Sequence, residues 1–113
     1  MHAVVVWWDL EGSGQTVKSL RDFLRNEAVD RFSRAEGLRL KFWISDASAR
    51  RWGAVLLWES AEAAAAPLPS RATEIIGRPP STRLAFDVEA TVEGLYTVAA
   101  LAGRGVALET PAG

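Results

Sequence analysis

Four short segments of the chain have the apolar pattern of β-strands, and they fall into two kinds. Residues 3–8 and 54–58 are apolar without interruption, which is typical of strands buried on both faces. Residues 38–45 and 82–89 alternate between apolar and polar side chains, which predicts strands with one face toward water. The pattern therefore predicts two central strands and two edge strands.

The segment 38–45 sorts its side chains onto two faces by alternation. One face carries Leu38, Leu40, Phe42 and Ile44, and the other carries Arg39, Lys41, Trp43 and Ser45. The polar stretch 46–53 that follows predicts a turn, so the next strand returns as an antiparallel hairpin.

A helix is predicted between the first two strands. Its apolar stripe has helical spacing and consists of Val17, Leu20, Leu24, Ala28 and Phe32. The stripe predicts a helix from Thr16 to about Ser33, with Thr16 or Ser13 as the N-cap.

The second helical region, after the third strand, is interrupted. An Ala-rich piece from Ser60 to Ala66 has Ser60 as its N-cap, and a second piece covers residues 70–76 with Gly77 as its C-cap. Pro67 and Pro69 separate the two pieces, because proline does not continue a helix.

The element order β-α-β-β-α-β predicts an α+β domain of the ferredoxin-like split βαβ type. Right-handed crossovers turn that order into an antiparallel sheet with strand order 4-1-3-2, and the two continuous apolar strands then occupy the centre. The 113 residues are sufficient for one domain. We expect a core at about residues 3–90 and a C-terminal tail at 91–113.

The predicted helices cover only one face of this sheet. Both central strands are apolar on the other face as well, and a contiguous apolar patch of that kind usually marks an interface. A second copy packed sheet to sheet would cover it with two-fold symmetry. The sequence therefore predicts a homodimer, the dimeric α/β-barrel arrangement.

Charge and composition narrow the partners and cofactors. The net charge is -1, which argues against nucleic acid as the main partner. No apolar run approaches the length of a membrane span, so we expect no membrane association and a cytoplasmic location. The chain has no cysteine and a single histidine, His2, so we also expect no metal, haem or flavin cofactor.

Five tryptophans in 113 residues are the most prominent candidate binding residues. Their indoles suit either a flat pocket for an aromatic ligand or the core and the dimer interface. The predicted substrate-binding residues are Trp7, Trp8, Trp52, Trp58 and Arg21. We expect them around a cavity between sheet and helices, with Arg21 or Trp52 near its mouth; no catalytic residue is assigned.

Two smaller groups have both a functional and a structural interpretation. Arg39, Lys41 and Trp43 share a predicted strand face, and a cation beside an indole suits an anionic or phenolate ligand. A charged edge strand protected against pairing explains the same residues, and the sequence favours that interpretation. Gly12-Ser13-Gly14 suits an anion nest or a flexible loop, and the flexible loop is favoured.

The segment from Glu36 to Trp43, the polar turn, and Gly53-Ala-Val-Leu-Leu-Trp-Glu59 before an Ala-rich helix resemble the dimeric α/β-barrel superfamily. Within it, the chain is similar to the YdhR-like mono-oxygenases, over about residues 3–90 and including the return strand 84–88. The resemblance implies a homodimer with a small-molecule cavity in each subunit. The superfamily includes cofactor-free oxygenases of aromatic polyketides, haem-degrading oxygenases and isomerases; His2 and Asn26 do not match the haem pattern.

Two functions from different classes follow. The first is a cofactor-independent mono-oxygenase or isomerase that acts on a small aromatic or apolar substrate in a pocket within one subunit. The second is a non-catalytic module of the same fold for ligand binding or assembly, favoured by the scarcity of His, Cys and paired carboxylates. Fold alone does not choose between them.

Overall fold

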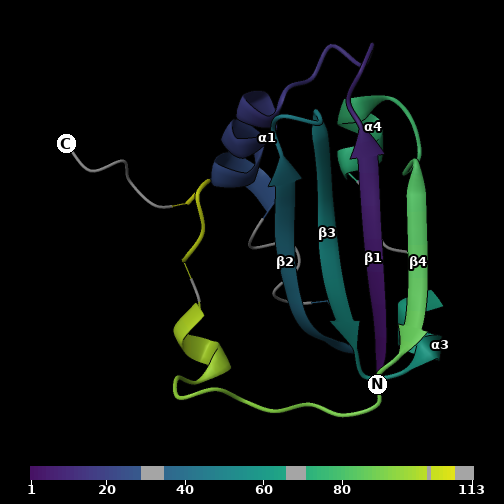
Figure 1. Cartoon of the computed structure of the whole chain (residues 1–113), viewed down its shortest axis with the longest axis vertical. Coiled ribbons are helices and arrows are strands. Elements are labelled where there is room, and N and C mark those ends of the chain that lie inside the picture. The colour runs from purple at the N-terminus through teal and green to yellow at the C-terminus, as the bar shows by residue number, and fades with distance from the viewer. Residues whose placement is uncertain (29–34, 66–70, 102, 109–113) are drawn as a thin grey trace.

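The computed structural model of the protein describes residues 1–28, 35–65, 71–101 and 103–108. Four strands, β1 (His2–Asp9), β2 (Leu38–Asp46), β3 (Arg51–Trp58) and β4 (Thr82–Asp87), form one open antiparallel sheet. The strand order is β2-β3-β1-β4 (Figure 1). This is the predicted order 4-1-3-2, and the arrangement is an α+β fold compatible with the ferredoxin-like type.

The first helix begins at the predicted cap. Thr16 Oγ1 accepts a hydrogen bond from the Ser19 amide at 3.0 Å, and Ser19 Oγ accepts one from the Thr16 amide at 2.9 Å. This reciprocal pair satisfies amides that the first turn leaves without helical partners. Helix α1 (Val17–Phe23) then continues as a π-helical turn, η1 (Leu24–Ala28); the rest of the predicted helix lies outside the described residues.

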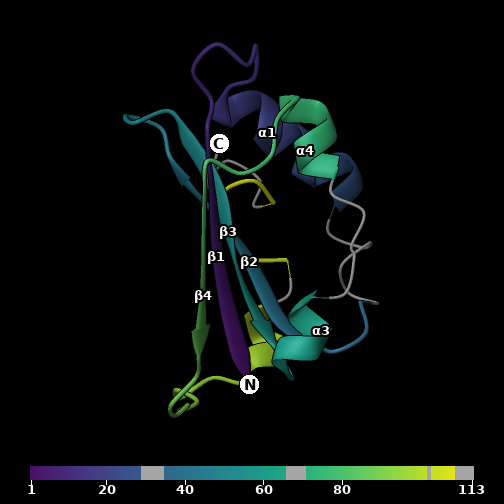
Figure 2. The same cartoon turned by 90° about the vertical axis from the view of Figure 1, so that its right-hand side faces the viewer.

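The interrupted second helical region consists of α3 (Ala61–Ala65) and α4 (Arg71–Ile76). Ser60 Oγ accepts from the Ala63 amide at 3.0 Å, as expected of an N-cap. Gly77 ends α4 with a φ of 86°, a left-handed conformation that glycine adopts without steric cost. Pro67 and Pro69 lie outside the described residues. All the described helices of this layer lie on one side of the sheet (Figure 2).

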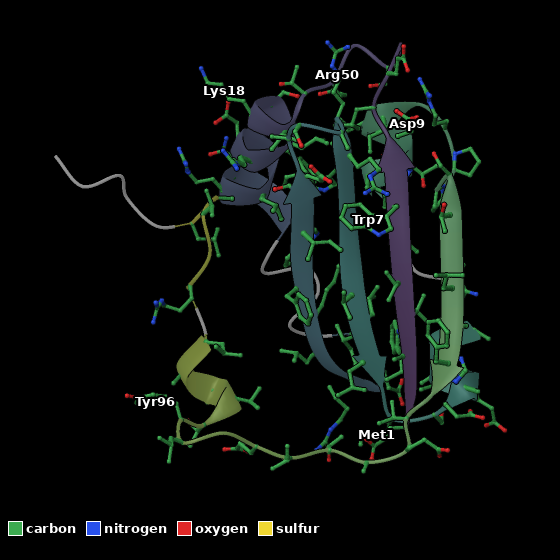
Figure 3. The ribbon with its side chains drawn as sticks, viewed as in Figure 1. Met1, Trp7, Asp9, Lys18, Arg50 and Tyr96 are labelled. Carbon is green, nitrogen blue, oxygen red and sulfur yellow. The ribbon has the colours of Figure 1, made fainter. Side chains whose placement is uncertain are left out.

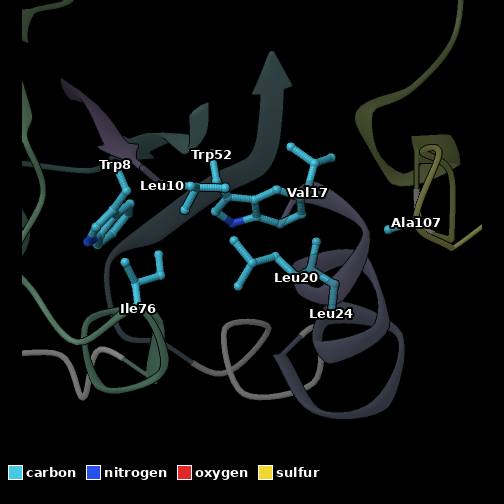
Figure 4. Close-up of a cluster of buried hydrophobic side chains, with 8 residues drawn as sticks. All are labelled: Trp8, Leu10, Val17, Leu20, Leu24, Trp52, Ile76 and Ala107. Carbon is cyan, nitrogen blue, oxygen red and sulfur yellow. The ribbon is translucent and has the colours of Figure 1, made fainter. Parts of the chain in front are cut away.

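The core lies between the sheet and these helices and has two parts. The larger cluster joins β1 and β3 to α1 and α4 through Trp8, Leu10, Val17, Leu20, Leu24, Trp52, Ile76 and Ala107 (Figure 4). The smaller cluster lies nearer α3 and consists of Val4, Ala54, Leu56 and Trp58. We call the side of the sheet that carries both clusters the helix-facing side.

The predicted faces of β2 are wrong at its beginning. The pairing with β3 shifts register between Leu38 and Leu40, as it does at a β-bulge, where one extra residue is left unpaired. Leu38 therefore packs against the smaller cluster, while Leu40 and the next alternate residues face the opposite side. Alternation alone does not reveal such a shift, because it assumes an unbroken period of two.

The opposite side of the sheet, which we call the open side, has no helix against it in the described part of the chain (Figure 2). The strand pairings place these apolar residues there: Ala3, Val5, Trp7, Leu40, Phe42, Ile44, Val55, Leu57, Leu84 and Phe86. Phe42 is 47% exposed and Phe86 is 51% exposed. Sequence alone predicted that both faces of the central strands are apolar, and the structure confirms it.

The turn between β2 and β3 is held by the carboxylate of Asp46. It accepts hydrogen bonds from Ser48 Oγ at 2.9 Å and from the Ala49 amide at 3.2 Å, and these bonds lower the Asp46 pKa. Arg50 completes the turn with a φ of 54°, a left-handed conformation that costs about 1 kcal/mol for a residue other than glycine.

The tail after β4 passes the lower end of the sheet and rises beside β2 to α1 (Figure 1). It contains one 3-10 turn, η2 (Val98–Leu101). Ala107 is buried against the larger cluster, and its carbonyl accepts a hydrogen bond from Arg25 Nε at 2.8 Å. The tail is therefore attached to the domain at both ends, with Leu95 and Tyr96 exposed between them.

Candidate functional site

The helix-facing side of the sheet carries a lysine in the middle of β2. Lys41 pairs with Leu56 of β3, a member of the smaller cluster, so its side chain leaves the strand on the same side as the core. Two residues further on, Trp43 pairs with Ala54 and lies on the same side. The lysine ammonium stands over the indole, with Nζ 4.6 Å from the ring centroid.

Trp43 links the two halves of the core. The indole packs against both hydrophobic clusters, so it is held between the end of the sheet under α1 and the end under α3. Leu38, Ala63 and Ala64 pack against the smaller cluster near α3. The side chain of Lys41 therefore leaves the strand beside these apolar residues, and its ammonium lies over the aromatic face of Trp43.

The electrostatic consequence is a lysine that titrates near neutrality. Burial lowers the pKa of Lys41 from 10.5 to about 7, because removal from water penalises the charged form. The Trp43 face attracts the ammonium, but the burial effect dominates. At neutral pH the neutral amine and the ammonium are both well populated, as acid–base catalysis requires.

Three of the predicted binding tryptophans are core residues on the helix-facing side. Trp8, Trp52 and Trp58 are each no more than 6% exposed. The indole N–H of Trp8 donates to the Arg78 carbonyl at 2.9 Å, which fixes the ring and occupies its donor. Trp52 lies next to Leu20 in the larger cluster (Figure 4), so the structure places it in the core and not at a cavity mouth.

Trp7 lies on the open side (Figure 3), whereas the other tryptophans of the prediction lie in the clusters of the helix-facing side. Its ring covers Gly53 of β3, where a Cβ would approach the ring within 2.9 Å. The guanidinium carbon of Arg51 stands 4.8 Å from the centroid of the Trp7 ring. Adjacent residues of a strand point to opposite faces, and this separates Trp7 from Trp8.

The two arginines considered in the sequence are not brought together with the Lys41–Trp43 pair. Arg21 lies half-buried in the last turn of α1. Arg39 lies at the register shift of β2 and pairs through Nε with Glu59 Oε2 at 3.4 Å, both side chains being well exposed. Of the group Arg39, Lys41 and Trp43, the structure joins only the last two.

A separate hollow lies at the loop end of the molecule. It has a volume of about 550 Å³ and is lined by Leu10, Glu11, Gly12, Gly14, Gln15, Thr16, Val17, Lys18, Ala47 and Arg50. Lys18 and Arg50 mark its position at the end of the sheet beside α1 (Figure 3). None of the five predicted binding residues lines it.

Within the ranges given above, no group of three or more His, Cys, Asp and Glu side chains is arranged to hold a metal ion. No helix in those ranges is long and apolar enough to cross a membrane.

The sequence named Lys41 and Trp43 as candidates but favoured a solvated edge strand, because the interpretation of β2 depended on which face meets the helices. The face with three apolar side chains, Leu40, Phe42 and Ile44, looked like the core face, and the face with Lys41 looked solvated. The sequence did contain a relevant signal. Both faces of β3 are apolar, so the pattern does not decide which face of the neighbouring strand β2 is exposed to solvent.

Comparisons with known proteins do not assign the chain to a family. No family model matches this chain, and no curated protein matches it either. The similarity to the dimeric α/β-barrel superfamily therefore stays a prediction from the residues quoted above.

Proposed function

We propose that this protein is a cofactor-independent mono-oxygenase or isomerase that acts, as a homodimer, on a small aromatic or apolar substrate held between the sheet and the helices. The observation that carries the proposal is the pair formed by Lys41 and Trp43. A single polar group set into an apolar wall orients a ligand by one strong interaction, while the apolar surface supplies the binding energy.

The proposed reactions require a substrate with an acidic proton and few catalytic groups from the protein. Removal of a proton gives a substrate anion, and an electron-rich anion passes an electron to O2. When a methylene group becomes a carbonyl, one oxygen atom enters the substrate and the other leaves as water with the two hydrogens. In the isomerase alternative the proton returns to a different atom. A low-dielectric surface strengthens the attraction between the anion and a nearby ammonium.

The homodimer is proposed from the open side of the sheet. Four strands about 4.8 Å apart and about six residues long cover roughly 400 Å² of sheet, which is within the range that marks interaction sites on soluble proteins. The ten apolar residues on this side include Phe42 and Phe86, each about half exposed. A second copy of the chain offers the same surface, so a two-fold contact buries both at once.

The experiment begins with binding and ends with turnover. Quenching of the tryptophan fluorescence identifies ligands from a panel of hydroxylated naphthalenes, anthrones and their non-acidic methyl ethers. An oxygen electrode and product analysis then follow each ligand under air, and anaerobic incubation detects isomerisation. The proposal expects turnover of acidic ligands and none of the methyl ethers. Binding with no change in any ligand would leave a ligand-binding module and overturn the enzyme.

A matched pair of variants connects the activity to the site. Lys41→Met removes the amine and keeps an unbranched apolar side chain, whereas Lys18→Met makes the same change at the exposed loop end. The proposal expects turnover to depend on Lys41 and not on Lys18.

A further inference from the structure

The hollow at the loop end of the molecule is separate from the Lys41–Trp43 pair, and its walls come from two segments that are far apart in the sequence. One wall is the loop between β1 and α1 with the beginning of α1, and the other is the turn between β2 and β3. The Leu10 amide donates a hydrogen bond to the Arg50 carbonyl at 2.9 Å and joins the two walls. The volume of about 550 Å³ is within the range of small-molecule sites.

Hydrogen bonds hold the loop wall in place. Ser13 Oγ donates to the Leu10 carbonyl at 2.7 Å and accepts from the Gln15 amide at 3.0 Å. Arg78, which follows α4, donates from Nη2 to the Glu11 carbonyl at 2.9 Å. A wall held in this way needs little ordering when a ligand binds, so less of the binding free energy is lost.

The turn wall contains a residue whose backbone conformation disfavours its side chain. Arg50 has a φ of 54°, in the left-handed region that glycine enters freely and that costs other residues steric energy. Strained residues of this kind cluster at binding and catalytic sites, where the surrounding structure holds them. Glycine would complete the same turn without this cost, which indicates that the arginine side chain has a use.

The two consecutive arginines of this turn differ in what their guanidinium groups contact. Arg51 Nη2 lies 3.4 Å from Asp46 Oδ2, and the Arg51 guanidinium stands over the Trp7 ring. Arg50 lies at the end of the sheet (Figure 3), and its guanidinium has no ion pair, hydrogen bond or ring contact in the described part of the chain. The Arg50 guanidinium is therefore available to a ligand.

The rest of the lining indicates which ligand fits. Leu10 and Val17 are buried members of the larger cluster, and both also line the hollow. Of the charged residues in the lining, Lys18 and Arg50 are cationic and Glu11 is anionic. The hollow therefore favours a ligand with an apolar body and a single negative charge, because Glu11 would repel a second one.

We propose that the hollow binds a small monocarboxylate with an apolar body, and that the Arg50 guanidinium holds the carboxylate group. The planar guanidinium presents two parallel N–H donors to the two oxygens of a carboxylate. The apolar body lies against Leu10 and Val17, and its burial adds to the affinity. Lys18 is exposed, and salt screens its charge, so it contributes little. The inference goes beyond the proposed function, because the hollow is a second site and no step of the reaction uses it.

The test follows the binding of benzoate by nuclear magnetic resonance of the isotope-labelled protein at constant ionic strength. The amides of Gly12, Gly14 and Arg50 report on the hollow, and the Trp43 indole reports on the site between sheet and helices. We expect benzoate to shift the three amides with a dissociation constant of about 1 mM or lower. Benzamide, which lacks the charge, and acetate, which lacks the apolar body, are expected to bind at least about tenfold more weakly.

Two results with the wild-type protein would overturn the proposal. One is the absence of a saturable shift at the three amides in benzoate up to roughly 20 mM, and a shift confined to the Trp43 indole counts as this result. The other is equal binding of benzoate and benzamide, which would show that the carboxylate group is not recognised.

Variants test whether Arg50 is the group that recognises the carboxylate. Arg50→Gly removes the guanidinium and relieves the strained turn, so we expect a protein at least as stable as wild type that binds benzoate at least about tenfold more weakly. Arg50→Lys keeps the charge without the paired donors and is expected to bind about threefold more weakly. Lys18→Met removes the other cation of the hollow and should stay within about twofold of the wild-type affinity.

Unchanged binding of benzoate to Arg50→Gly would contradict the proposal. An equal loss of affinity in Arg50→Gly and Lys18→Met would contradict it as well, because a general attraction to positive charge would then explain the binding. If Arg50→Gly does not fold, the comparison of Arg50→Lys with Lys18→Met decides the question, and the proposal requires the larger loss in Arg50→Lys.

Discussion

The two sides of one sheet have different chemistry although the same strands build both. The helix-facing side is packed, and its buried members include Leu20 of α1, which is 1% exposed, and Trp58 of β3. The open side is apolar from edge to edge and is not covered by any helix among the described residues, with Phe86 51% exposed. Apolar alternation in a strand therefore does not identify the side that meets the helices.

One charged residue of β2, Lys41, lies among covered apolar side chains, and it is the basis of the functional difference between the two sides. Lys41 lies on the helix-facing side, where three apolar residues would have been expected, and those residues, Leu40, Phe42 and Ile44, lie on the open side. The arrangement is useful if the open side is covered by a second copy and the helix-facing side holds a ligand. Three experiments test the difference and a fourth tests the helix layer, from the largest expected effect to the smallest.

The contribution to stability should differ most between the two sides. Leu20→Ala removes a side chain that is 1% exposed, and we expect it to lower the free energy of unfolding by about 3 kcal/mol. Phe86→Ala on the open side is expected to lower it by less than about 1 kcal/mol when measured at a concentration too low for association. Urea denaturation measures both; equal losses would mean that the open side is part of the core.

Lys41 should make stability depend on pH in a known direction. The folded pKa of about 7 lies below the ordinary value of 10.5, so between these values the unfolded chain binds the extra proton and stability rises with pH. The penalty is complete below about pH 7 and disappears toward 10.5.

We therefore expect Lys41→Met to be more stable than wild type at low pH by on the order of 3 kcal/mol, with the difference vanishing at high pH. Denaturation series across that range measure it, with Lys18→Met as the control. A Lys41→Met variant that is less stable at every pH would show that the amine stabilises the fold.

Self-association should depend on the open side alone. Phe42→Asp places a charge on that side, halfway along the edge strand β2, and we expect the dissociation constant of the homodimer to rise by about 30-fold or more. Leu95→Asp makes the same type of change in the tail, at a residue that is 99% exposed, and should leave association unchanged. Sedimentation equilibrium measures both; a wild-type protein of 12.3 kDa at high concentration would contradict the homodimer.

The smallest expected effect concerns the helix layer and neither side of the sheet. Thr16→Ala removes one half of the reciprocal cap with Ser19, and we expect a loss of about 1 kcal/mol. Thr16→Ser keeps the hydroxyl and should keep most of the stability. Hydrogen exchange of the first amides of α1 measures the change locally, and unaltered protection in Thr16→Ala would mean that the cap is redundant.

Local chemistry explains which parts of the fold were predictable from the sequence. Thr16 and Ser60 cap their helices through side-chain oxygens, so their positions follow from the chain alone. The strand order followed from the element order and right-handed crossovers, and the continuous and alternating strand patterns agreed with it. The side of the sheet on which Lys41 lies did not follow, because both faces of the neighbouring strand β3 are apolar and only the pairing with β3 shows which face of β2 meets the helices.

The binding residues were harder to predict than the fold for a related reason. A tryptophan in a strand has the same pattern whether it fills the core, covers the open side or lines a ligand site. The structure assigns Trp8, Trp52 and Trp58 to the core and Trp7 to the open side. Trp43 differs from these four through its contact with Lys41, two residues away on the same face of β2.

The most direct test of the central claim is the titration of the Lys41 amine itself. Brief acetylation with trace acetic anhydride across a pH series, followed by peptide mass spectrometry, gives the reactivity of Lys41, with Lys18 in the same molecule as the internal reference for the reagent. We expect the reactivity of Lys41 to be half-maximal at a pH of about 7, because burial lowers its pKa. A half-maximum near the ordinary value of 10.5 would contradict the claim that the helix-facing side holds a base.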